Sequence, residues 1–357
     1  MSSRKQSGAI LIITLWIIAI LAALSVGIGG RAGLDIKLAG FYRDNMRVLY
    51  LAKAAIERAI AEKQKDAADP DNKSDSLNES WSDNKDLFYN HAIEGMANTS
   101  YTVSYGYKED LSDKGSVLYG MMDEASKINI NKIVNPETSE IDMARKGHFE
   151  NLLQIVCGLN ASQAASLSEA LIDWIDADHI ALATSEDEDE KYYQDAGGVS
   201  YCKNSALESL EELPLIKGFE SVILYGDKQQ GKCGIIDFVT IYTDGRVNVN
   251  TAPKEVLESL GFTADQAGDV ISYRKGQMES STGGVITGLE NLTDATIVYS
   301  DSENIGNINE IIPYLSTTSD TYRCYVTANV NRVKKKIDCV VSVVSGELPG
   351  FKYWKEY

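Results

Sequence analysis

The chain has 357 residues, a hydrophobic fraction of 44 % and a formal net charge of −18. This length suits two or three domains with packed cores, and the acidic balance argues against a nucleic-acid-binding protein, which needs Lys and Arg to contact phosphate. It fits an extracytoplasmic surface or one that holds cations. The three histidines and five cysteines are scattered, so they indicate neither a zinc site nor a histidine relay.

The N-terminal segment is the strongest single feature. Arg4 and Lys5 precede an uncharged run over residues 6–30, apolar almost throughout from Ala9. Such a run can cross a bilayer as a helix, since that takes roughly 20 apolar residues, and the basic residues predict a cytoplasmic N-terminus. Three interpretations compete: a Sec signal peptide cut in the mid-twenties, an uncleaved signal anchor, or a class III (pilin-type) signal cut between Gly8 and Ala9 that leaves the helix in place.

The sequence after this run favours the pilin-type interpretation. Residues 31–65 contain no proline. Apolar side chains, and the stem of one lysine, recur there at helical spacing: Met46, Leu49, Tyr50, Lys53, Ile56 and Ile60. The membrane segment is therefore predicted to continue into an amphipathic helix that ends near Lys65 and buries this face. A Sec signal peptide would not need such a continuation.

Several later segments have strand character. Residues 66–85 are polar and predict a loop, and alternation predicts strands over 99–107 and 116–131. Residues 233–250 return to strand character. The segment 321–346 predicts two strands around Asn331-Arg332. With these two residues as the turn, Val330 faces Val333, Val326 faces Ile337 and Cys324 faces Cys339.

The region between these strands is mostly helical. Residues 144–178 predict two helices joined near Gly158 and Asn160, and 207–219 and 307–315 predict short helices. Residues 251–277 predict a helix, a tight turn at Gly261 and a second helix, with Thr251 as cap and Pro253 in the first turn. The sequence thus predicts an α+β fold in which a helical domain is inserted into a small α/β domain.

A short phrase occurs twice, as "DEASKININ" at 123–131 and as "DGRVNVNTA" at 244–252. Alternation puts the β-branched residues on one face and the asparagines on the other, and each copy precedes a helix–turn–helix segment. Asparagine amides can bond loop and helix-end backbone groups. We expect a structural role for this phrase, as a joint between strand and helix, rather than a direct role in binding.

Five segments together resemble one known family. These are "SGAILIITLWIIAIL" at the N-terminus, "DEASKININ", "LIDWIDAD" (171–178), "YCKNSALESLEEL" (201–213) and "GRVNVNTAPKEVLESL" (246–260). In this order, and spread over the chain, they resemble the general secretion pathway protein K family of type II secretion systems. Pilin-type helices usually carry a glutamate at mature position five, but Ile13 stands there, as expected for this family. The dense acidic stretch 186–190 departs from the family pattern.

The resemblance implies a non-enzymatic minor pseudopilin in the inner membrane, with its bulk periplasmic. Prepilin peptidase would cut after Gly8 and leave Ala9 as the N-methylated N-terminus. The protein would sit at the tip of the pseudopilus with minor pseudopilins I and J and major pseudopilin G, start its assembly and support secretion. The implied domains are a leader (1–8), a pilin helix (9–65), a pilin-like α/β domain (66–128 and 316–357) and an inserted helical domain of helix-hairpin-helix or SAM-like units (129–315), with the second repeat at 244–277.

The acidic residues are the main ligand candidates. Asp173, Asp176 and Asp178 lie at a predicted helix end, and the run that follows includes Glu188, Asp189 and Glu190. Calcium takes six to eight oxygens in flexible geometry, so these carboxylates could hold it, although they form no EF-hand. The resemblance adds weight, because calcium in the helical domain is known in the family. The alternative is a solvated acidic loop with local caps.

Other interpretations remain open. Cys324 and Cys339 could form a cross-strand disulfide in an oxidising periplasm, or stay buried thiols. The 251–277 hairpin resembles DNA-binding helix-hairpin-helix units, as in competence or type IV pilus-like machines, but its turn has one glycine and carries an acid. A Sec-secreted calcium-binding protein is a further alternative. Asp173 and Asp176 could be the paired carboxylates of a glycosidase, yet no nucleophile–base pair or phosphate loop accompanies them.

Overall fold

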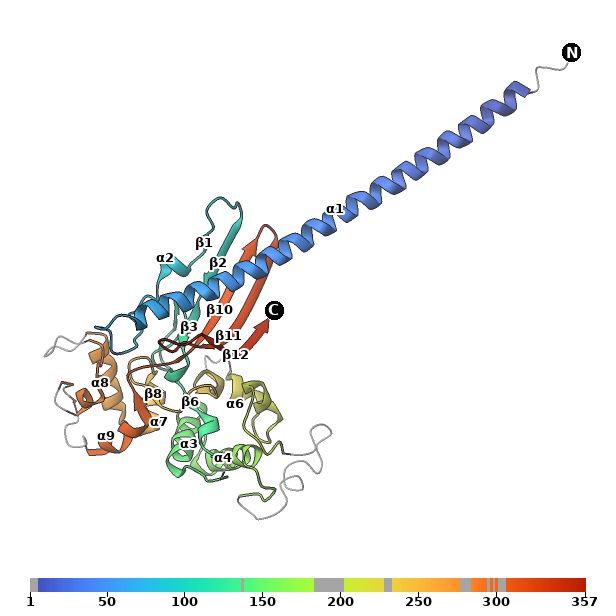
Figure 1. Cartoon of the computed structure of the whole chain (residues 1–357). Helices are drawn as coiled ribbons and strands as arrows, with labels where there is room; N and C mark the ends of the chain where they lie inside the picture. Colours follow the sequence, from blue (N-terminus) through green and yellow to red (C-terminus); the bar gives the residue numbers. More distant parts are fainter. Residues whose placement is uncertain are drawn as a thin grey trace.

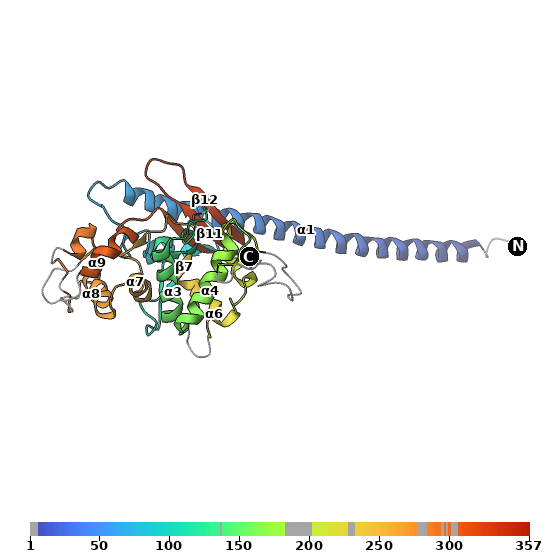
Figure 2. The same ribbon diagram turned by 90° about the horizontal axis from the view of Figure 1, so that it is seen from below.

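The computed structural model describes residues 6–135, 138–182, 202–227, 233–276, 284–293, 296–297, 299–300 and 306–357. Its most visible feature is a helix, α1 (Gln6–Ala67), that projects far beyond a body of sheets and short helices (Figure 1). The N-terminal end of α1 is free and the other end packs on the body, as Figure 2 also shows. The predicted α+β class, with a long N-terminal helix and small antiparallel sheets, is confirmed.

The half of α1 that packs on the body buries a stripe rich in small side chains. The buried residues are Val48, Ala52, Ala55, Ile56, Ala59 and Ile60, three or four positions apart along one face. The predicted face was therefore only partly right, because Met46 and Tyr50 point to solvent. Alanines let the sheet approach the helix closely, so the contact follows them rather than the larger apolar side chains. The helix ends at Ala67, two residues beyond the predicted end.

The main sheet packs against this stripe. Its strands run antiparallel in the order β1-β2-β10-β11-β12, and β5 also pairs with β10. They are β1 (His91–Ala92), β2 (Thr99–Val103), β5 (Met122–Asp123), β10 (Thr321–Val330), β11 (Val333–Ser342) and β12 (Gly350–Glu356). The predicted C-terminal hairpin is confirmed, with Val330 opposite Val333, Val326 opposite Ile337 and Cys324 opposite Cys339.

A first hydrophobic core lies between α1 and this sheet. Trp81 and Phe88 are fully buried in it, the latter at the end of α2 (Lys85–Phe88). The ring of Trp81 packs edge-on against Tyr322 of β10, with centroids 4.9 Å apart. The segment predicted as a polar loop, 66–85, thus supplies one of the largest side chains of this core.

A second hydrophobic core lies within residues 128–315. The 3₁₀ turn (η) η1 (Glu124–Ser126) precedes this core. The helices and 3₁₀ turns of the core region are η2 (Ile130–Lys132), α3 (Met143–Cys157), α4 (Ala161–Ile175), η3 (Leu210–Leu215), α6 (Ser221–Tyr225), η4 (Ile235–Asp237), α7 (Lys254–Leu260), α8 (Ala264–Arg274), η5 (Leu289–Leu292), α9 (Gly306–Ile311) and η7 (Ile312–Tyr314). This placement matches the region predicted to be mostly helical, while the division of the chain into domains stays a prediction.

Three two-stranded sheets complete the described structure. They are β3 (Tyr105–Tyr107) with β4 (Ser116–Leu118), β6 (Ile128–Asn129) with β7 (Val239–Thr240), and β8 (Val247–Asn248) with β9 (Leu315–Ser316). The long strands predicted over 99–107 and 116–131 are therefore wrong, since each is divided. The first breaks at Ser104, whose N–H bonds to the Tyr325 carbonyl of β10. Residues 233–250 likewise hold only two short strands.

The two copies of the repeated phrase begin two similar units. Each copy contains a short strand, β6 or β8, that pairs in parallel with a strand far along the chain, and each leads into a helix hairpin, α3–α4 or α7–α8. The turns of both hairpins share a second repeat, "GLNASQA" at 158–164 and "GFTADQA" at 261–267. In each, a left-handed glycine ends the first helix, and Asn160 or Thr263 forms a capping box with a glutamine.

The asparagines of the repeated phrase join distant parts of the chain. In each copy the first asparagine accepts a bond from the N–H of the second, at 3.0 Å for Asn129 and for Asn248. The second asparagine bonds both the N–H and the carbonyl of a remote residue: Asn131 bonds Leu207, and its counterpart Asn250 bonds Ile286 in the same way. These bonds agree with the structural role expected for the phrase.

The sequence predicts Thr251 as the cap of the helix that follows it, but in the structure Thr251 does not cap that helix. Pro253 takes the N-cap position of α7, and the Thr251 hydroxyl donates instead to Asp123 Oδ2 at 2.6 Å. Asn248 Nδ2 donates to the same oxygen at 3.0 Å. Asp123, the first residue of the first copy, is thus bonded by Asn248 and Thr251 of the second copy. Both copies lie where the second core meets the main sheet.

Candidate functional site

The N-terminal part of α1 has the composition of a membrane helix. It is long and apolar enough to cross a bilayer, and its most apolar stretch is not covered by any other described part of the protein. Exposing such a stretch to water is unfavourable, so it needs lipid or other apolar helices around it. Gly8 and Ala9 lie on this helix. Processing between them stays a prediction.

The predicted aspartates lie at the end of α4 and just beyond it. Asp173 is buried and its Oδ1 accepts from the Leu182 N–H at 3.0 Å. Asp178 is exposed and its Oδ1 accepts from the Ile180 N–H at 2.8 Å. Between them Asp176 is buried, and burial raises its pKa to about 7, helped by the charges of Asp178 and Asp173.

Two oxygens beside these aspartates lack partners among the described residues. Asp176 Oδ1 and Asn204 Oδ1 are both buried without a hydrogen bond, although the Asn204 amide donates to the Asp178 carbonyl. A buried oxygen without a partner is costly unless a cation or water meets it. The three aspartates do not converge as a ready metal cluster in the described part of the chain. The predicted ligands Glu188, Asp189 and Glu190 lie outside the described residues.

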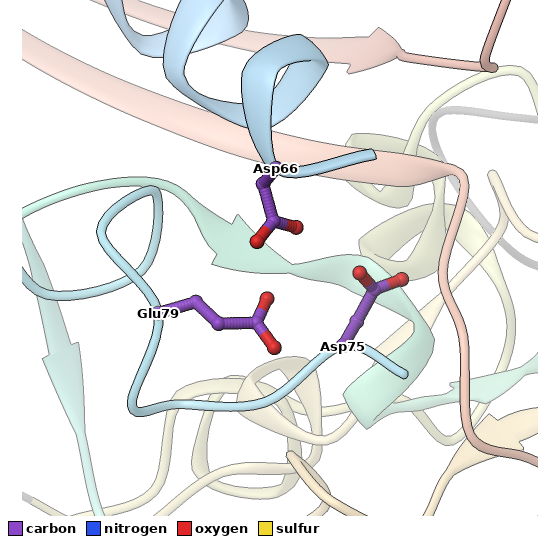
Figure 3. Close-up of side chains that lie close together, drawn as sticks. All are labelled: Asp66, Asp75 and Glu79. Atoms are coloured by element: carbon purple, nitrogen blue, oxygen red, sulfur yellow. The ribbon is translucent and has the colours of Figure 1, made fainter. Parts of the chain in front are cut away.

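The described residues do bring three other carboxylates together. Oxygens of Asp66, Asp75 and Glu79 all lie within 4.8 Å of one another (Figure 3). Asp66 belongs to the last turn of α1, and the other two belong to the loop that follows it. The Lys63 ammonium lies 2.6 Å from Asp66 Oδ2, also donates to Asp75, and is 5.3 Å from the Trp81 ring. The Lys63 ammonium therefore supplies the positive charge that a metal ion would otherwise supply among these carboxylates.

The sequence does not predict this cluster, because its three acids lie in the segment 66–85 that is expected to be a polar loop. Burial would lower the pKa of Lys63, but Asp75 and Asp66 raise it above its ordinary value. Glu79 Oε1 accepts from the N–H and hydroxyl of Ser76, and Oε2 from the Trp81 indole. Burial nevertheless raises the pKa of Glu79 to about 7, and the neighbouring aspartates add to the shift. We assign the cluster a structural role: it holds the loop that contains Asp75 and Glu79 against the last turns of α1.

Glu79 should make stability depend on pH. Its pKa is about 7 when folded and near 4.5 when unfolded, so the folded state retains a proton that the unfolded state loses between these values. The free energy of unfolding is therefore expected to fall as pH rises from about 4.5 to 7, and Glu79→Gln should reduce that fall. Urea unfolding of the detergent-solubilised protein from pH 5 to 8 measures it. The exposed Glu94→Gln is the control, and equal slopes for both variants would contradict this assignment.

The cysteine pair lies where the hairpin register predicts. Cys324 and Cys339 are opposite each other on β10 and β11, both buried, and both are free thiols in the structure. Cys339 Sγ lies 3.8 Å from the Cys324 carbonyl oxygen. The hydrogen bond with Cys339, together with burial, raises the pKa of Cys324 well above its ordinary value, which makes it a poor nucleophile. The disulfide stays a prediction.

Comparison with known proteins finds one family model that is similar to part of the helical region. A family model described as "Type II secretion system (T2SS), protein K" matches residues 126–225. We call this segment, which is similar to that family model, the protein K domain. The resemblance of the chain to the protein K family is thereby confirmed. No match is found among curated protein sequences.

A solved structure has a similar fold over most of the chain. It is a chain of the GspK-GspI-GspJ complex from the type 2 secretion system of enterotoxigenic Escherichia coli. The TM-score is 0.64 at 14 % sequence identity, and the match covers 88 % of this chain and 97 % of that chain. The shared fold thus extends well beyond the protein K domain.

The protein K domain contains the first of the two repeated units. It begins within the first copy of the repeated phrase, at Ser126, and ends with α6 at Tyr225. The hairpin α3–α4 and the buried carboxyl of Asp176 lie inside it, whereas the hairpin α7–α8 lies outside the matched range. The calcium candidates therefore fall within the segment that the family model matches.

Proposed function

We propose that this protein is a non-enzymatic minor pseudopilin of a type II secretion system, anchored in the inner membrane by α1. The observation that carries the proposal is the protein K domain on a chain whose N-terminal helix leaves its apolar surface uncovered. A filament subunit needs such a helix, because lipid surrounds it before assembly and neighbouring helices replace the lipid afterwards. The N-terminus would face the cytoplasm and the body the periplasm.

Within the pseudopilus, we propose a place at the tip. The body around the second core is broad compared with α1 (Figure 1), so it fits at an end more easily than inside a filament. Ile13 stands where a pilin helix usually carries an acid, so the helix offers no carboxylate to the amino terminus of a neighbour. Minor pseudopilins I and J would be direct partners, major pseudopilin G would follow, and the complex would start assembly and support secretion.

The mature N-terminus tests this proposal most directly. Mass spectrometry of the protein purified from native membranes should find Ala9 first, carrying a methyl group, as expected after prepilin peptidase cleavage. Minor pseudopilins I and J should copurify. A start in the mid-twenties would mean a Sec signal peptide, and the loss of the membrane helix would overturn the pseudopilin proposal.

We also propose that the protein K domain binds calcium near the end of α4. Asp176 supports this, because its buried Oδ1 has no hydrogen-bond partner among the described residues and the charge of Asp178 acts on it. Asn204, whose amide donates to the Asp178 carbonyl, has a second buried oxygen without a partner in the same described part. Carboxylate and amide oxygens suit calcium. Zinc usually takes several histidine or cysteine ligands, and of these His179 lies beside Asn204, with its Nδ1 2.8 Å from Asn204 Nδ2. Asp176, Asp178 and the side-chain oxygen of Asn204 would be its ligands.

Calcium is expected to raise the melting temperature of the protein relative to a chelator. Asp176→Asn should remove most of this increase, because it takes away the charged buried oxygen. Differential scanning calorimetry with calcium or with EGTA measures the effect. Asp269→Asn, an acid of α8 outside the protein K domain, is the control. An equal melting temperature with calcium and with chelator would overturn the calcium proposal and leave the pseudopilin proposal unaffected.

A further inference from the structure

A cleft of about 1020 Å³ lies between the main sheet and the second core. One wall is the β3–β4 hairpin, over residues 104–108 and 114–117, and the opposite wall comes from η3 and η4. Side chains of β10, β11 and β12 form the remaining side. This volume is at the upper end of what ligand pockets usually have, and the cleft is open to solvent, so a molecule larger than a small metabolite can enter.

The lining is rich in tyrosine and balanced in charge. Its tyrosines are Tyr105, Tyr107, Tyr225, Tyr325, Tyr353 and Tyr357. Four basic residues line it with four acidic ones: Lys108, Lys114, Lys127 and Arg323, with Asp123, Glu211, Asp237 and Asp338. Tyrosine supplies a large, rigid contact surface with a polar tip, which is the property that protein-binding loops exploit. A balanced lining does not favour an anion or a metal ion.

The strongest positive group in the cleft is already engaged. Arg323 bonds both oxygens of Asp338, at 2.9 and 2.8 Å, and its guanidinium carbon lies 5.2 Å from the Tyr325 ring and 5.4 Å from the Tyr353 ring. An arginine held in this way stiffens two aromatic side chains rather than binding a phosphate or carboxylate. These two of the six tyrosines are therefore held in place before any ligand binds.

The β3–β4 hairpin presents backbone as well as side chains. In the described part of the chain these two strands pair only with each other, so each has an outer edge without a strand partner. Gly106 is exposed on β3, and Val117 of β4 keeps 57 % of its surface exposed. Unpaired strand edges bind extended polypeptides by adding a strand, and apolar or aromatic pockets beside the edge then select side chains.

We propose that this cleft binds an extended polypeptide segment of another protein, which adds as a strand to an edge of the β3–β4 hairpin and places side chains against the tyrosines. An oligosaccharide could stack on the tyrosines, but it would not use the unpaired backbone edge. The cleft is separate from α1 and from the calcium candidates, so it can bind a polypeptide whichever secretion or pilus-like machine contains the protein.

The test uses the detergent-solubilised full chain and a phage-displayed library of random linear peptides about 12 residues long, the length of an extended binding segment. Gly106→Trp narrows the cleft, and a Cβ at this position would meet no heavy atom within 4 Å. Gly350→Trp is the matched control, a strand glycine with equally open surroundings outside the cleft. Selected peptides are measured by fluorescence anisotropy and by hydrogen exchange.

Selected peptides are expected to bind about tenfold more weakly to Gly106→Trp and equally well to Gly350→Trp. Backbone amides within residues 104–108 and 114–118 should exchange more slowly in the complex, because strand addition bonds them. Peptides that bind Gly106→Trp as tightly as the unmodified chain would overturn the site. Binding without slower exchange of these amides would overturn strand addition. Failure to select any peptide sensitive to Gly106→Trp would likewise count against the proposal.

Discussion

Replacing Glu124 by alanine is expected to lower the free energy of unfolding by about 3–5 kcal/mol, the usual effect of breaking a buried ion pair from one side. Glu124 is fully buried in η1 and lies 3.4 Å from the Lys127 ammonium and 3.7 Å from the Arg323 guanidinium. It also accepts a bond from the Thr240 hydroxyl. Arg323 belongs to the main sheet, Thr240 to β7, and Lys127 directly follows η1, so the carboxylate joins the two cores.

The pKa of Glu124 shows that its surroundings stabilise the ionised carboxylate. Burial alone would raise this pKa, but Lys127 and Arg323 bring it below its ordinary value. The alanine variant would leave Lys127 buried without its carboxylate partner, which accounts for most of the expected loss.

Glu356→Ala is the matched control for this prediction. Glu356 lies 2.6 Å from Lys335 in a more exposed ion pair on the same sheet, and its removal is expected to cost less than about 1 kcal/mol. Urea unfolding of both variants in detergent at pH 7 measures the difference. A Glu124→Ala variant no less stable than Glu356→Ala would show that the buried charges do not hold the two cores together.

Gly120→Ala is expected to destabilise the protein by roughly 3 kcal/mol or more, as a backbone clash in a packed region does. A Cβ at this glycine would come within 2.5 Å of the Ser82 carbonyl oxygen and closer still to that of Trp81. The two segments cannot separate easily, because the Met121 N–H bonds to the Trp81 carbonyl at 2.8 Å and the Asn84 N–H bonds to the Tyr119 carbonyl at 2.6 Å.

Thermal or urea unfolding of Gly120→Ala checks this expectation, with Gly106→Ala as the control. Gly106 is exposed and its added methyl group would meet no neighbour, so that variant should change the free energy of unfolding by less than about 1 kcal/mol. Near-native stability of Gly120→Ala would mean that the loop around Trp81 can move away from Gly120, and that the first core does not depend on this close approach.

Sequence patterns within a few residues of a turn correctly predicted the C-terminal strand hairpin and the two helix hairpins. The register of β10 and β11 followed from alternation around a two-residue turn. The first helix hairpin followed from Gly158 and Asn160 at its turn, and the second from the tight turn at Gly261. The buried face of α1 could be predicted only in part from the sequence. Periodicity alone could not decide between the alanine stripe and the larger apolar residues, since that choice depends on how closely the sheet approaches.

Features built from distant residues could not be predicted from the sequence. The carboxylates of Asp75 and Glu79 meet Asp66 only because the loop after α1 folds back, and Trp81 enters the first core from the same loop. Of the predicted calcium ligands, Asp176 lies near Asp173 and Asp178. A search for acidic residues could not find Asn204, whose buried oxygen lacks a partner among the described residues and whose amide bonds to the Asp178 carbonyl. The duplicated hairpin turns were visible in the sequence, as a glycine, a capping residue and a glutamine at fixed spacing.

The pairing of β5 with β10 has a consequence for how the chain can vary. Asp123 at the end of β5 lies opposite Tyr322 at the start of β10, so the roughly 200 residues between them leave and re-enter the main sheet at one point, like the loop of a hairpin. The entropy of closing such a loop grows only logarithmically, by about 0.6 kcal/mol for each doubling of its length. Insertions or deletions within these residues therefore hardly affect the sheet, which leaves the size of the helical part free to change while the anchor and sheet stay the same.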